Sequence, residues 1–69
     1  MRDQLRKTLQ SRLAILRDEM PFFPEDLRMD PRQLLKETIE QDLAIAKVDG
    51  NKREIAEYEL SLSLVDELA

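Results

Sequence analysis

Apolar residues in the first twenty positions of the chain recur at helical spacing. They follow one another at steps of four, four, three and four residues: Leu5, Leu9, Leu13, Leu16 and Met20. At about 100° per residue these positions fall within an arc of roughly 80° on one side of a helix. Pro21 lacks the backbone N–H that a continuing helix would need. The pattern therefore predicts an amphipathic helix over residues 2–20, followed by a turn over residues 21–30.

A second helix has a strong start signal. Asp30 stands at the N-cap position, Pro31 at the first helical position and Gln33 at the third, which is a capping-box arrangement. Pro24, followed by two acidic residues, has the composition of a single helical turn just before it. The apolar positions after Pro31 keep helical spacing, so the second helix is predicted over residues 31–48.

The third helix is predicted over residues 52–68. Gly50 ends the preceding helix, and Asn51 with Glu54 three residues later forms a second capping box, so residues 49–51 form a tight turn. Residues 58–64 alternate strictly between apolar and polar, which is typical of a half-buried strand. We favour a helix because the segment follows a good cap, is rich in Leu and Glu, and has no second strand to pair with.

These elements predict an all-α fold: a single domain over residues 1–69, consisting of an N-terminal helix and a helical hairpin. One Gly, three Pro and 38% charged residues agree with helices joined by few breaks. A chain of 69 residues without Cys or His has no disulfide and lacks the commonest metal ligands. Oligomerisation or partner binding is then the remaining source of stability, and we predict an intermolecular helical bundle.

The two hairpin helices carry more apolar surface than a hairpin core uses. One stripe on each helix suits the hairpin interface: Leu35, Ile39, Leu43 and Ala46, and Ile55, Tyr58, Leu62 and Val65. A second stripe lies on another side of each helix: Leu34, Ile45 and Val48, and Ala56, Leu60, Leu64 and Leu68. This second face predicts self-association, with a homodimer the commonest solution, or binding of another protein. The alternative is a compact three-helix monomer that buries both stripes.

Asp42 lies between the two stripes of the second helix. One interpretation is a buried carboxylate that pairs with an arginine of the first helix and fixes the register of the bundle. The other is a residue at the bundle edge that stays solvated, because acidic residues are almost never fully buried without a partner.

The turn after the first helix has apolar content. Phe22 and Phe23 stand between two prolines, and Leu27 and Met29 follow them. The general tendency of aromatic rings to be buried favours a turn that folds back and caps the end of the bundle. The alternative hypothesis is an exposed apolar patch offered to the groove of a partner. These four residues are the candidate docking turn.

Charge is unevenly distributed along the chain. Residues 1–17 carry five basic and one acidic side chain, a balance of +4, whereas residues 18–69 carry six basic and fourteen acidic ones, a balance of −8. The basic edge of the first helix consists of Arg2, Arg6, Arg12 and Arg17. It makes nucleic-acid binding by a helical dimer the alternative function. The net charge of −4 and the lack of aromatics interleaved with the arginines disfavour that alternative.

The sequence gives little support for catalysis or metal binding. A calcium loop centred on Gly50 would need ligands at Ile45 and Ala56, and neither side chain can ligate. No His is present to activate a serine, so we expect no enzyme activity, cofactor, metal or small-molecule substrate. No apolar run approaches the ~20 residues of a membrane span, and we expect an acidic cytoplasmic protein with no membrane partner. The predicted function is a non-enzymatic interaction module: an adaptor, assembly factor, or regulatory or inhibitory subunit.

Overall fold

The computed structural model describes residues 2–68, and this part of the chain is all helical, as predicted. Three α-helices and two short 3₁₀ turns follow one another: α1 (Arg2–Glu19), η1 (Met20–Phe22), η2 (Glu25–Leu27), α2 (Pro31–Asp49) and α3 (Lys52–Val65). The first helix ends one residue before the predicted position, because Met20 belongs to the 3₁₀ turn with Pro21. The second extends one residue further. Residues 58–64 lie inside α3, so the strand alternative is wrong.

The cap residues set the bounds of α2 and α3. The Asp30 carboxylate accepts a hydrogen bond from the backbone N–H of Arg32 at 3.0 Å, and the Asn51 side chain accepts one from the N–H of Glu54 at 3.2 Å. Gly50 has a φ of 71°, the left-handed conformation that favours glycine. The Asn51 N–H bonds the Ala46 carbonyl at 3.1 Å, which completes a Schellman motif. The turn between the two helices is therefore tight, as predicted.

Helix α3 ends at Val65, three residues before the predicted end. The N–H of Glu67 bonds the carbonyl of Leu64 at 2.9 Å, and that of Leu68 bonds Val65 at 3.2 Å. These bonds span three residues, so the chain tightens and leaves the α-helical path. Leu68 nevertheless stays buried, with 4% of its surface exposed.

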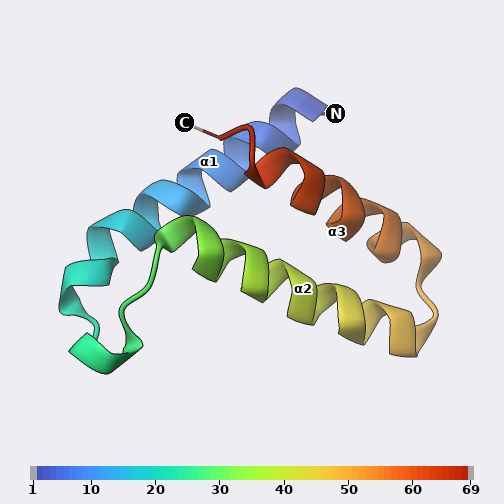
Figure 1. Cartoon of the computed structure of the whole chain (residues 1–69). Helices are drawn as coiled ribbons and strands as arrows, with labels where there is room; N and C mark the ends of the chain where they lie inside the picture. The colour runs from blue at the N-terminus through green and yellow to red at the C-terminus, as the bar shows by residue number, and fades with distance from the viewer. Residues whose placement is uncertain (1, 69) are drawn as a thin grey trace.

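Helices α2 and α3 form an antiparallel hairpin, and α1 lies across one end of it (Figure 1). That end is where α2 begins and α3 finishes, whereas the Gly50 turn extends away from α1 (Figure 1). The main core lies where the three helices meet: Leu9, Leu13, Leu35, Ile39, Leu64, Val65 and Leu68. Each fully buried apolar side chain contributes roughly 1.5–3 kcal/mol through removal from water. The apolar stripe predicted for α1 supplies two of these residues.

The molecule is flat and open. Its Cα positions extend over 37 × 27 × 14 Å with a radius of gyration of 12.9 Å. A compact domain of this length has a radius of gyration of about 11 Å. The difference arises because α1 covers only one end of the hairpin. The far half of the hairpin therefore keeps its α1-facing side uncovered.

Candidate interaction surfaces

The predicted second face of the hairpin is divided between core and surface. Leu64 and Leu68 are buried in the core of the chain itself, and Leu34 and Leu60 are half-buried. The other three residues of the face are exposed: Ile45 at 62%, Val48 at 87%, and Ala56. Leu64 and Leu68 are thus not available to a partner in this conformation. Helical spacing places all seven residues on comparable sides of their helices, and the position of α1 decides which of them are covered.

The exposed part of the second face lies toward the Gly50 turn, beyond α1. We call Ile45 and Val48 the hairpin-tip patch. Both belong to the last two turns of a well-capped helix, so their side chains are held on a rigid element. A rigid apolar surface loses little conformational entropy on binding, which suits a docking site.

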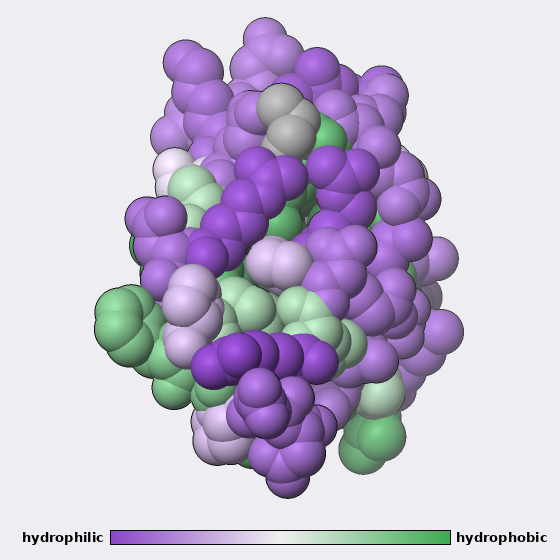
Figure 2. Space-filling model, turned by 60° about the vertical axis from the view of Figure 1, so that its left-hand side comes forward, coloured by the Kyte–Doolittle hydropathy of each residue, from purple (hydrophilic) through white to green (hydrophobic). Residues whose placement is uncertain are grey.

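The connector between α1 and α2 is also apolar and partly exposed. Phe22 is 87% exposed and Leu27 61% exposed, whereas Phe23 and Met29 are half-buried. The prediction that the turn buries both rings is wrong for Phe22. Green and pale apolar surface gathers between hydrophilic residues in the lower part of Figure 2, the view that brings the connector side forward.

Arg28 fixes the shape of the connector. Its guanidinium donates hydrogen bonds to the carbonyl oxygens of Pro21 and Phe23, each at 3.0 Å. The predicted single turn after Pro24 forms as the 3₁₀ turn Glu25–Leu27. Because Arg28 bonds backbone carbonyl groups of the connector, the connector is a folded turn and not a loose loop. Phe22 is exposed on the outside of this turn.

A groove of about 590 Å³ runs between α1 and α3. We call it the α1–α3 groove, and its lining is mostly apolar with a polar rim: Gln4, Leu5, Thr8, Leu9, Arg12, Ile39, Glu57, Tyr58, Leu60 and Ser61. A smaller hollow of about 230 Å³, lined by Arg12, Ile15, Leu16 and Thr38, follows on the same side of α1. Arg12 lines both hollows, so together they form one furrow beside α1. The sequence pattern gave no sign of this site, because it depends on where α1 crosses the hairpin.

The α3 side of the groove is acidic. Partial removal from water raises the pKa of the Tyr58 phenol above 10.0, and the carboxylates of Asp42, Glu54 and Glu57 raise it further, while Arg12 on the opposite wall opposes the shift. These three carboxylates are thus close enough to act on the pKa of the phenol, and Glu57 lines the groove beside it. The groove thus has a basic residue on the α1 wall and acidic residues beside the α3 wall.

Asp42 takes the second of its two predicted roles. It is half-buried beside Tyr58, and no ion pair joins it to an arginine of α1 within residues 2–68. Its carboxylate instead adds negative charge near the Tyr58 phenol.

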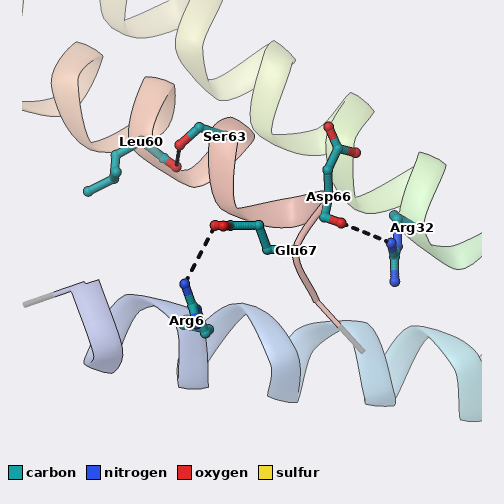
Figure 3. Close-up of polar contacts among 6 residues, drawn as sticks. All are labelled: Arg6, Arg32, Leu60, Ser63, Asp66 and Glu67. Atoms are coloured by element: carbon teal, nitrogen blue, oxygen red, sulfur yellow. Dashed lines mark hydrogen bonds and ion pairs between the residues drawn. The ribbon is translucent and has the colours of Figure 1, made fainter.

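The arginines of the basic edge separate in the structure. Arg6 pairs with Glu67 beyond the end of α3 at 3.5 Å (Figure 3), while Arg12 lines the groove on another side of α1. Arg2 and Arg17 are exposed. The Arg6–Glu67 pair joins the basic first segment to the acidic remainder of the chain. A continuous basic row is not formed by these four residues.

The start of α2 holds the end of α3. The Arg32 guanidinium donates to the carbonyl oxygen of Asp66 at 3.5 Å (Figure 3) and to that of Leu68, and the Lys36 ammonium lies 2.7 Å from the Asp66 carboxylate. Helix C-terminal carbonyls lack intrahelical partners and favour nearby cations. The contacts are therefore structural and strengthen the three-helix junction.

Nothing in the described residues assembles a metal site: no group of three or more acidic, His or Cys side chains converges between residues 2 and 68. In the same range, every helix is too short or too polar to cross a bilayer. Comparisons with models of known protein families, with curated proteins and with solved structures gave no match.

Proposed function

We propose that this chain is a small non-enzymatic protein–protein interaction module, acting as an adaptor, an assembly factor, or a regulatory or inhibitory subunit. The observation that carries the proposal is the outward placement of large apolar side chains on folded elements. Val48 of α2 and Phe22 of the connector are each 87% exposed. Single exposed apolar residues are normal, but here they accompany an apolar groove and an uncovered half of the hairpin.

The surface area supports the same proposal. The chain exposes 5119 Å² for a mass of 8.1 kDa. A compact monomer of that mass exposes about 4,500 Å². The excess of about 600 Å² is comparable to the ~800 Å² that each partner buries in a standard interface. A partner would therefore cover surface that a compact monomer of this size would already have buried.

Composition agrees with a binding function in place of catalysis. The chain has no His and no Cys, which carry most proton-transfer and thiol chemistry near neutral pH. The nucleic-acid alternative gains no specific support, because Arg6 is engaged by Glu67 and Arg12 lines an apolar groove that has Glu57 on its other wall. We therefore do not propose it.

Site-specific photocrosslinking in the cells that carry the gene tests this proposal. A photoreactive residue would replace Val48 or Phe22, and, as matched controls, the exposed polar residues Glu40 or Gln10. We expect discrete covalent adducts of higher mass from the two apolar positions and few or none from the controls. Equal adduct patterns at all four positions, or none at any, would contradict an interaction module that uses these apolar surfaces.

A further inference from the structure

We propose that the α1–α3 groove binds a second copy of this chain, so that each copy places its basic α1 along the groove of the other in a two-fold symmetric dimer. This inference rests on the proposed function and names the partner of one of its surfaces. It commits the groove to self-association and leaves the hairpin-tip patch and the connector to other proteins.

The two walls of the groove carry opposite charges. Arg12 lines the α1 wall, and Glu57 lines the α3 wall, with Asp42 and Glu54 close to the neighbouring Tyr58. Arg12 and Glu57 do not pair with each other, and the ion pair of Glu57 within residues 2–68 is a 3.7 Å contact with the exposed Arg53. Arg12 makes no ion pair within residues 2–68, and the Glu57–Arg53 pair is long and exposed, so a partner of opposite charge can engage both side chains.

A second copy of the chain offers a negative charge to Arg12 and a positive charge to Glu57 at the same time. In a two-fold symmetric interface the same patch occurs on each subunit, so contact between Arg12 and the second copy's Glu57 is necessarily repeated in reverse. The charge balance of +4 in residues 1–17 and −8 in residues 18–69 gives the same attraction over a longer range. One basic wall and one acidic wall make a self-complementary surface.

The apolar lining of the groove and the exposed area of the chain also suit a second copy. Leu5 of α1 and Leu60 of α3 are half-buried at the groove, and Ile15, 55% exposed, extends the apolar surface along α1. An amphipathic helix in this furrow would bury these side chains, as helices do in hydrophobic grooves of helical partners. The excess exposed area of about 600 Å² per chain approaches the ~800 Å² that each subunit of a standard interface buries.

The test is light scattering over a wide concentration range, with charge-reversal variants. In the dimer, Arg12→Glu places an acidic residue against Glu57 of the other copy at both symmetry-related contacts. Glu57→Arg likewise places a basic residue against Arg12 at both contacts. We expect the wild type to reach twice the mass of the chain, and each variant to dissociate about ten- to a hundredfold more readily, because each reversal changes two attractions into repulsions. An equimolar mixture of the two variants restores both ion pairs, so the mixture should dimerise about as well as the wild type.

Matched controls carry the same charge changes outside the groove. Arg17→Glu and Glu59→Arg alter exposed residues that do not line the groove, and both should dimerise like the wild type. Far-UV circular dichroism establishes that every variant is still helical. If a variant loses its helical signal, Arg12→Gln and Glu57→Gln replace the reversals, with a weaker effect of the same direction.

Three results would overturn the dimer. They are a wild type that stays monomeric at all concentrations, a wild-type dimer that neither reversal weakens, and two weakened variants that fail to recover on mixing. A groove occupied by a different protein would show as a monomeric wild type with a photocrosslink to another chain from a residue placed at Thr8. Failure of the dimer would leave the interaction-module proposal standing as long as Val48 or Phe22 still gives discrete adducts.

Discussion

The guanidinium of Arg32, in the first turn of α2, donates a hydrogen bond to the main-chain carbonyl oxygen of Leu68, beyond the end of α3. A second bond reaches the carbonyl of Asp66 at 3.5 Å, and Lys36 lies one turn further along α2 and contacts the Asp66 carboxylate. Two helix ends that are far apart in the sequence are thus joined at the junction that α1 also contacts. The cation satisfies carbonyl groups that the helix itself leaves without a partner.

We expect Arg32→Ala to lower the free energy of unfolding by about 1–3 kcal/mol, because it leaves the partly buried Leu68 carbonyl group without a charged donor. Arg32→Lys should recover part of the loss, since one ammonium cannot replace a two-pronged guanidinium. Urea denaturation followed by circular dichroism measures both. Arg53→Ala serves as control: that side chain is 90% exposed, and its removal should change stability little. Equal effects of the Arg32 and Arg53 substitutions would contradict the role given to Arg32.

Leu64 and Val48 belong to the same predicted second face but should respond very differently to truncation. Leu64 is 0% exposed and Val48 87% exposed. Leu64→Ala should cost about 2–5 kcal/mol through lost burial and the cavity left behind. A domain of this length has a free energy of unfolding of only about 3–10 kcal/mol, so this one substitution would remove a large part of it. Val48→Ala should change the midpoint of urea unfolding little. Similar costs at both sites would mean that α1 does not cover α3 as described.

The local elements were predictable because their signals are short-range. Asp30, Gly50 and Asn51 act on backbone groups within a few residues, so their identity alone defines where α2 and α3 begin and where α2 ends. The end of α3 was placed three residues too late. Its early end coincides with contacts from Arg32 and Lys36, which are thirty or more residues away in sequence. Only the tertiary structure brings them together.

The candidate site was less predictable because it depends on which surface α1 covers. Periodicity identified Leu64 and Val48 as apolar positions on a second face, yet it contains no information on which helix lies against each. The α1–α3 groove likewise exists only because α1 crosses the hairpin near one end. Burial of Phe22 was expected from its ring alone, whereas the connector is held by Arg28 bonds to its own carbonyl groups, and these leave that ring outside.

Gly50 allows a direct test of backbone conformation. Its φ of 71° lies in the left-handed region, and an added Cβ would meet no atom within 4 Å. Gly50→Ala should therefore destabilise the fold by about 1–2 kcal/mol through backbone strain alone, without a steric clash. Gly50→Asn should cost less, because Asn tolerates this conformation better. Thermal unfolding of the three proteins at one concentration gives the order Gly, Asn, Ala; an Ala variant as stable as Gly would show that the turn adopts another conformation.

The titration of the Tyr58 phenol reports on the charges near the α1–α3 groove. Its pKa is raised above the ordinary 10.0 by partial desolvation and by Asp42, Glu54 and Glu57, and is lowered in part by Arg12. Absorbance of the phenolate should therefore give a pKa above 10.0 in the folded protein, lower in Glu57→Gln and higher in Arg12→Gln. Because the folded pKa exceeds the unfolded one, the contribution of Tyr58 to stability is complete below pH 10 and is lost as pH rises through the folded pKa. Tyr58→Phe should remove that part of the alkaline decline. A titration of Tyr58 that responds to neither substitution would place Glu57 and Arg12 too far from the ring to form opposite walls of one groove.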